Sequence, residues 1–430
     1  MRLTDLLTAN ADVVRRRARR ARRGVGSVAL GLCVGLTFAA RTSIAQVAVE
    51  RGAEWSAPKA IAGAPATRSI SSPSIAVKGD TLYVAASLLP TSPGSAMGMR
   101  HLLLSRVPGG PLPIPDGVFS FAFPQGIVDR AGTYHLFWTE FRSFDTTRTT
   151  WPSTPNSLWH AAFSHGAWSS PEKLLDARSL YWNGEQSHVV LDSNGVVHVA
   201  VAAFLNAEFG IEHLTLRGGR WSAEHIPTWA LYASIAATRQ YLFLVFVTPD
   251  SAAGSTTRLL AQRAALDGIW ESPVPIAPAG QRQPSHPIAL AERDSLHVLW
   301  NASGTLDGAQ RLHYALSDDR GTSWREKASI AAQGISSSTR AALTPCGPTL
   351  IVETLERTST DMRVTLREIR LDDSMAPTVR AVYPEFPVTA SGGLASTGDS
   401  LALAFAGARD SSASPSVEIG RRAACAATKR

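Results

Sequence analysis

The chain has 430 residues, of which 44% are hydrophobic and 18% charged, and its formal net charge is +7. Nine of the 42 basic residues but only two of the 35 acidic residues lie within residues 1–45, so residues 46–430 carry 33 charges of each sign. A neutral body lacks the electrostatic attraction on which nucleic-acid binding depends, and we expect no nucleic-acid partner.

The first 45 residues have the organisation of a signal peptide. An arginine-rich start at residues 15–23 precedes an apolar run at residues 24–40, and Ser43-Ile44-Ala45 supplies the small residues of a cleavage site. The paired Arg22 and Arg23 permit the twin-arginine route, although arginine-rich starts also serve the general route. We therefore predict cleavage near Ala45 and export to the periplasm or the outside. No membrane insertion is expected afterwards, because no later apolar run reaches the roughly 18 residues that cross a bilayer.

Residues 46–430 repeat a unit of four predicted strands. A first strand of small residues is followed by a tight turn, such as Asn194-Gly195, and then by a second strand rich in β-branched and aromatic residues. A third, alternating strand and a Trp-containing fourth strand complete the unit. The second strand recurs at residues 81–86, 133–138, 196–201, 241–247, 295–300, 349–354 and 400–405.

Four antiparallel strands repeated at such spacing are typical of a β-propeller blade. We predict an all-β fold, a single β-propeller of seven four-stranded blades over residues 46–430; a six-bladed ring with one repeat as an insertion is the alternative. Residues 52–61 contain a Trp phrase with no strands before it. We expect this segment to form the outer strand of the last blade, beside residues 416–422, because closing the ring removes an exposed sheet edge.

One turn has a sequence of special form. Residues 317–324 nearly match the Asp-box pattern S-x-D-x-G-x-T-W. Ser317 and Asp319 can accept hydrogen bonds from turn amides, Gly321 can adopt a left-handed conformation, and Trp324 can pack between blades. With the Trp phrases and the four-strand unit, this turn resembles the sialidase-like (BNR-repeat) β-propellers over essentially the whole mature chain. In that family the Asp-box is structural and lies on the face away from the binding site.

The resemblance also implies where a site should lie. Sialidases of this superfamily carry a Phe-Arg-Ile-Pro segment, three arginines that hold the substrate carboxylate, a Tyr/Glu nucleophile pair and an Asp acid. The Phe-Arg-Ile-Pro segment is absent here, and its nearest counterpart contains Arg68. Arg282 and Arg340 also stand just before predicted first strands. Three guanidinium groups that converge could bind a carboxylate or sulfate, whereas solvated loop arginines are the alternative.

Further candidates lie in the segments that lead into first strands. Residues 181–188 combine two aromatic rings with Glu185 and His188, which are the catalytic candidates because acid or base catalysis needs a carboxyl or imidazole near the scissile bond. Alternatively, these aromatics plug the channel. The predicted ligand-binding residues are Arg68, Tyr181, Trp182, Trp229, Arg282, His286 and Arg340.

Cys346 and Cys425 could form a disulfide in an oxidising compartment, or stay unpaired. The histidines recur at equivalent strand positions, which favours packing over metal binding, so we expect no metal and no cofactor. We also expect a monomer.

Two functions fit these features. The first is an exported propeller that binds a glycan or protein at the channel mouth without the standard sialidase catalytic set. The alternative is a divergent carbohydrate-active enzyme, either an exo-sialidase-like glycoside hydrolase or a polysaccharide lyase. Because propellers support many activities, the fold leaves open whether the protein is an enzyme.

Overall fold

The computed structural model describes residues 56, 59–63, 68–90, 101–116, 122–140, 157–182, 188–250, 257–277, 282–303, 310–331, 335–344, 349–357, 362–370, 388–397, 400–407 and 416–423. All of them belong to one compact unit, Val47–Arg430. The predicted signal peptide, Glu185, Cys346 and Cys425 lie outside the described residues.

The described residues form strands and connections, with no helix among them, and their strands make seven antiparallel sheets. Three sheets pair in chain order: β2 (Arg68–Lys78), β3 (Thr81–Pro90), β4 (His101–Val107) and β5 (Gly110–Pro111); β16 (Tyr232–Ala237), β17 (Tyr241–Pro249), β18 (Thr257–Ala265) and β19 (Val274–Pro275); and β20 (Arg282–Glu292), β21 (Ser295–Ser303), β22 (Gln310–Ser317) and β23 (Arg325–Ala331). Another contains β24 (Ile335–Leu343), β25 (Thr349–Arg357) and β26 (Met362–Arg370).

Two further sheets contain a divided strand. In one, β6 (Ala122–Val128), β7 (Tyr134–Glu140) and β8 (Ser157–Ser164) pair in order, and both β9 (Ala167–Trp168) and β10 (Glu172–Asp176) pair with β8. In the other, both β11 (Ser179–Tyr181) and β12 (Val189–Leu191) pair with β13 (Val197–Leu205), which is followed by β14 (Glu208–Arg217) and β15 (Arg220–Ile226). The remaining sheet has the order β27 (Val388–Thr397), β28 (Ser400–Gly407), β29 (Ser416–Ala423) and β1 (Lys59–Gly63).

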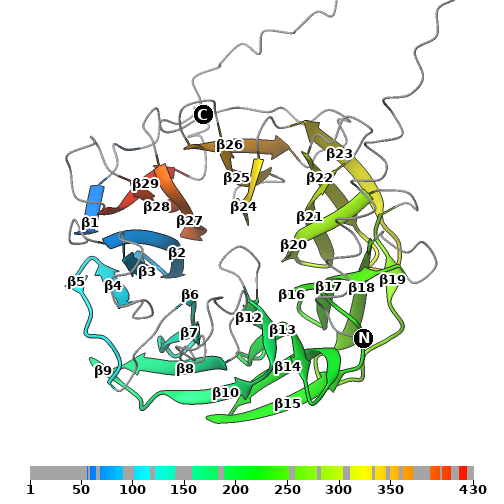
Figure 1. The fold of residues 1–430 in the computed structure, drawn as a ribbon, viewed down its shortest axis with the longest axis horizontal. Coiled ribbons are helices and arrows are strands. Elements are labelled where there is room, and N and C mark those ends of the chain that lie inside the picture. Colours follow the sequence, from blue (N-terminus) through cyan, green and yellow to red (C-terminus); the bar gives the residue numbers. More distant parts are fainter. Residues whose placement is uncertain are drawn as a thin grey trace, which may run out of the picture. The chain divides into compact units, whose positions relative to one another are not determined.

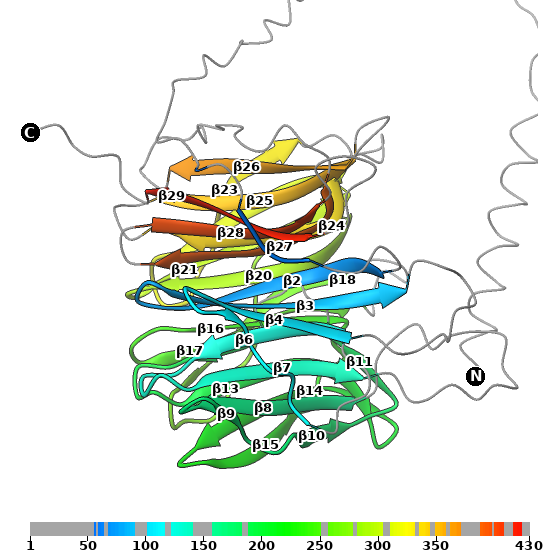
Figure 2. The same cartoon turned by 90° about the vertical axis from the view of Figure 1, so that its left-hand side faces the viewer.

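The sheets are arranged in a ring around a common centre (Figure 1), and Figure 2 shows them from the side. The strands nearest the centre contact one another in the order β2, β6, β12, β16, β20, β24 and β27, and β27 in turn contacts β2. The ring of contacts is therefore closed. The prediction of an all-β propeller is confirmed.

The two ends of the described chain meet in one sheet. Strand β1 pairs antiparallel with β29, from Lys59 opposite Ile419 to Gly63 opposite Ser416. Ser56 extends this pairing, because its N–H donates to the Arg421 carbonyl at 2.7 Å and its hydroxyl accepts from the Arg421 N–H at 3.0 Å. The N-terminal segment is the outer strand of the last sheet, as the lone Trp phrase predicted, although Trp55 itself is not described.

The second strands β7 and β13 are buried over most of their length because each sheet is packed between two others. In β13 the first seven residues are all buried, and in β7 the first six. The Trp phrases then join neighbouring sheets. The Trp168 indole N–H donates to the Pro113 carbonyl at 2.8 Å, while Trp221 and Trp270 meet histidine rings of the preceding sheet edge-on.

The propeller has two faces that differ in their connections. We call the end where the chain passes from one sheet to the next the crossover face. The opposite end, where the first strand turns into the second and the third into the fourth, is the turn face. The turn at residues 317–324 joins β22 to β23 and therefore lies on the turn face.

This turn has the hydrogen bonds expected from its residue types. The Gly321 N–H donates to Ser317 Oγ at 2.8 Å, and the Ser323 N–H and hydroxyl donate to the Asp319 carboxylate at 2.9 and 2.6 Å. Gly321 has φ +78°, and a Cβ there would lie 3.0 Å from the Phe243 ring. Burial alone would raise the pKa of Asp319, but the hydrogen bonds from Ser323 and Ser317 outweigh it and lower the pKa to about 2. Trp324 packs against the core between sheets β16–β19 and β20–β23.

Candidate functional site

The three predicted arginines do not occupy equivalent positions in their strands. Arg68 and Arg282 are each the first residue of an 11-residue strand, β2 and β20. Arg340 instead lies inside β24, after the register shift that ends at Thr339, and it is opposite Glu353. Its predicted place just ahead of the strand was therefore wrong, and it lies further from the crossover face. The three side chains lie outside the described part of the structure, so their convergence remains a prediction.

Trp182 and His188 are brought together at the inner end of sheet β11–β15. Their rings stack with centroids 4.5 Å apart, and both side chains are buried. The Trp182 indole N–H donates to the Phe123 carbonyl at 2.8 Å. His188 Nδ1–H donates to the Ala200 carbonyl at 2.9 Å. In this arrangement both rings pack between sheets rather than facing solvent.

Tyr232 and His286 meet across the next pair of inner strands, β16 and β20. Their ring centroids are 4.5 Å apart. Burial lowers the pKa of His286 to about 4, so its imidazole is neutral at pH 7. His286 and Gln283 have φ +50° and +51°, at the two register shifts of β20. Backbone strain of this kind often accompanies functional sites.

Trp229 lies on the crossover face in the connection from β15 to β16, and its side chain is 54% exposed. Its ring stacks on Phe209 with centroids 5.2 Å apart, and Phe209 contacts Phe204 at 4.5 Å. The Arg178 guanidinium lies 5.4 Å from the Phe204 ring centre. We call Arg178, Phe204, Phe209 and Trp229 the aromatic platform.

Tyr181 lies next to this platform. It is half-buried, packs with the core that contains Ala230, and is opposite Ala202 in the register of β13. Burial raises the pKa of its hydroxyl, an effect that a hydrogen bond with Ser179 opposes. Tyr181 is therefore a neutral phenol at pH 7.

Sequence reasoning found Trp229 but missed the rest of the platform. Phe204 and Phe209 flank a hairpin turn in which Asn206 and Ala207 have φ +49° and +68°. The signal was present as two Phe residues around an Asn-containing turn, but their contact with Trp229, some 20 residues later in sequence, depends on how the sheet ends pack.

Neither a membrane-spanning helix nor a metal site is found among the described residues. No helical segment there has the length and apolar character needed to span a bilayer. Nor do the described side chains gather three or more His, Cys, Asp or Glu in a way that could hold a metal ion.

Comparisons with known proteins give the fold. No family model and no curated protein matches the chain. Among solved structures, an ulvan lyase of polysaccharide lyase family PL25 matches with a TM-score of 0.52 and 11% identity, over 84% of this chain and 94% of the lyase. Polysaccharide lyase Uly1 matches with a TM-score of 0.50 and 9% identity, over 83% and 90%. The α-L-arabinofuranosidase Arb93A from Fusarium graminearum gives 0.47 and 14%, over 70% and 92%.

These neighbours are named for action on carbohydrates. At such low identity, the likeness to the two lyases shows the shared propeller fold and leaves function to the residues of this chain.

Proposed function

We propose that residues 46–430 form an exported, monomeric propeller of the sialidase-like type that binds a glycan on its crossover face. The observation that carries this proposal is the exposed ring of Trp229, stacked on Phe209. An indole held flat by a second ring offers the apolar face of a sugar a large contact area. Little conformational entropy is lost on binding, because the packing already fixes the ring.

Arg178 favours an acidic glycan. Its guanidinium stands over Phe204 at the far end of the platform and is exposed. A guanidinium binds a carboxylate or sulfate through two parallel hydrogen bonds. The same class of ligand is named for one ulvan lyase structure, which is bound to -[GlcA(1-4)Rha3S]-. This supports a charged polysaccharide as the first ligand to test.

The test is a glycan array with residues 46–430, followed by calorimetry on two matched variants. Trp229 and Ile269 are both exposed large hydrophobic residues, 54% and 87% exposed, but Ile269 follows the β18–β19 turn on the turn face. Trp229→Ala should weaken glycan binding at least about tenfold, and Ile269→Ala should leave it unchanged. Equal affinities for the two variants would contradict the proposal, as would an array without a bound glycan.

A second candidate function is cleavage of the bound glycan, and the Tyr232–His286 pair favours it. A neutral imidazole beside a phenol, on the inner strands β16 and β20, can accept a proton from a substrate. The expected substrate is a uronic-acid polysaccharide. The base removes the proton from the carbon next to the carboxylate, a carbon–carbon double bond forms as the bond to the glycosidic oxygen breaks, and the leaving oxygen takes a proton from water. A His286→Asn variant tolerates the positive φ but is not a base. If the wild-type protein releases unsaturated products and the variant does not, the protein is a lyase; if neither does, it is a binding protein.

A further inference from the structure

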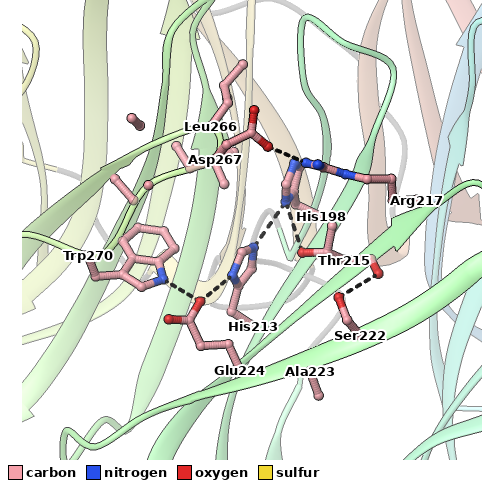
Figure 3. A pocket seen from close by; sticks show the side chains of 14 residues that line it. His198, His213, Thr215, Arg217, Ser222, Ala223, Glu224, Leu266, Asp267 and Trp270 are labelled. Atoms are coloured by element: carbon pink, nitrogen blue, oxygen red, sulfur yellow. Dashed lines mark hydrogen bonds and ion pairs between the residues drawn. The ribbon is translucent and has the colours of Figure 1, made fainter.

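A cavity of about 460 Å³ opens on the turn face between sheets β11–β15 and β16–β19 (Figure 3). Its volume is within the range of roughly 300–1,000 Å³ that is usual for small-molecule sites. The cavity and the aromatic platform lie at opposite ends of the same strands, on the turn face and the crossover face. The residues of the cavity wall include His198, His213, Arg217, Glu224, Asp267 and Trp270.

A chain of hydrogen bonds runs from the protein interior to this cavity. His198 Nε2 lies 3.4 Å from Asp192 Oδ2, and His198 Nδ1 lies 3.1 Å from His213 Nε2. The other Asp192 oxygen accepts the N–H groups of Asn194 and Val196, both at 2.8 Å, so the turn fixes the orientation of the carboxylate. These partners assign the tautomers: His198 donates from Nε2 to Asp192, and His213 donates from Nε2 to His198.

The chain ends in two acceptors that face each other at the cavity. With its Nε2 proton used, a neutral His213 presents a lone pair on Nδ1, and this atom lies 3.4 Å from Glu224 Oε2. Burial, and secondarily His198, lower the pKa of His213 to about 4, so the ring is neutral at pH 7. The same Glu224 oxygen accepts the Trp270 indole N–H at 3.1 Å. His213 Nδ1 and Glu224 together therefore suit a donor that reaches both.

The repeat accounts for only some of these polar groups. Sheet β6–β10 contains the same pair of stacked histidines. His135 Nδ1 lies 3.0 Å from His160 Nε2, and Trp221 meets His160 edge-on. In two other copies of the Trp phrase, however, the position of Glu224 is occupied by Pro, namely Pro171 and Pro273. The histidines and tryptophans are thus common packing elements. A His–Glu contact also occurs in sheet β20–β23, where His313 Nδ1 lies 2.7 Å from Glu326 Oε1, so Glu224 differs from the Pro copies but not from every other sheet.

The ion pair at the rim distinguishes this interface from the preceding one. Arg217 and Asp267 come from adjacent sheets and pair at 2.6 Å. Arg217 is four residues after the third-strand histidine, and Asp267 is three residues before the Trp of the next sheet. At the preceding interface these two positions are occupied by Ser164 and Gly218, which cannot form such a pair. The Arg217–Asp267 pair is neutral as a unit, which leaves Glu224 and the buried Asp192 to make the cavity negative and attractive to a cation.

We propose that this cavity is a second binding site, for a monosaccharide-sized ligand with a primary ammonium group, such as an amino sugar. The ammonium donates to His213 Nδ1 and Glu224 Oε2, where its charge meets the carboxylate. The sugar hydroxyls then lie among Thr215, Ser222 and the Arg217–Asp267 pair, all of which line the cavity. The site is independent of glycan binding on the crossover face.

The test is calorimetry of residues 46–430 with glucosamine, N-acetylglucosamine and glucose at millimolar concentrations. Glucosamine should bind at least about tenfold more tightly than the other two, because only it carries the ammonium that pairs with Glu224. Glu224→Gln keeps an oxygen for the Trp270 N–H but removes the charge, and should weaken glucosamine binding at least about tenfold.

Two controls separate the site from other causes. Glu271→Gln removes a neighbouring carboxylate that pairs with Arg263 outside the cavity, and should not change glucosamine binding. Trp229→Ala should not change it either. Absence of glucosamine binding to the wild-type protein would overturn the proposal, and so would equal binding of the three sugars or full binding by Glu224→Gln. Thermal melting of each variant establishes that the fold is intact.

Discussion

Replacing His160 with Gln should change how the stability of the protein depends on pH. His160 is buried, and its Nε2–H donates to His135 Nδ1, since the other nitrogen of His135 faces Asp129 at 3.3 Å. Burial, and then the neighbouring His135, lower the pKa of His160 from 6.5 to about 3. Between these values the unfolded chain binds a proton at this position and the folded protein does not, so stability falls as the pH falls through that window.

The magnitude follows from linkage. One histidine that stays neutral in the folded state costs about 1.4 kcal/mol of stability for each pH unit below its unfolded pKa, which is about 2 kcal/mol between pH 6.5 and 5. Gln at position 160 keeps an N–H donor for His135 but does not titrate. The free energy of unfolding of the variant should therefore drop by about 2 kcal/mol less than that of the wild type over this range, since the other histidines contribute equally to both.

The assay is urea unfolding of both proteins at pH 6.5 and pH 5, with His165→Asn as control. His165 is exposed in the turn after β8 and has φ +50°, which Asn tolerates. The control should follow the wild-type pH dependence. Parallel pH dependences of wild type and His160→Gln would refute the reasoning, because they would mean that the buried ring takes up a proton as readily as it does in the unfolded chain.

Three further changes test other parts of the structure. Asp319→Ala removes the acceptor for Ser323 and should lower the free energy of unfolding, measured in urea, by about 1–2 kcal/mol. Asp318→Ala, at an exposed neighbouring position, should have little effect. Equal effects of the two changes would contradict the structural role of the turn. Deleting residues 46–63 removes β1 and exposes the edge of β29, so light scattering should show aggregation and the melting temperature should fall; an unchanged melting curve would argue against closure. Arg178→Gln should weaken binding of acidic glycans several-fold and leave neutral glycans unaffected in calorimetry, and equal losses for both would exclude a charge contact.

The fold was predictable because each strand carries its own signal. The buried run at residues 196–201 became β13, and the lone Trp phrase near the N-terminus anticipated the pairing of β1 with β29. Both depend on local residue pattern and on the physical need to cover a sheet edge. Neither requires knowledge of which side chains meet.

The candidate sites were only partly predictable because they depend on contacts between distant segments. Trp229 stood out as an aromatic residue in a connection, but its stacking on Phe209 depends on how two sheet ends pack. Arg68 and Arg340 differ in level because Arg68 begins β2 opposite Pro90, whereas Arg340 lies inside β24 opposite Glu353, and the sequence pattern does not reveal where these strands begin. The turn-face cavity had one sequence signal, Glu224 in place of a recurrent Pro, whose meaning emerged only from its contact with Trp270.

The measurement that tests the central proposal most directly is a crystal structure of residues 46–430 with the oligosaccharide that binds most tightly on the array. The account predicts a sugar ring stacked on Trp229, with an acidic group of the ligand directed towards Arg178. An oligosaccharide bound elsewhere on the propeller, with Trp229 still exposed to solvent, would contradict it.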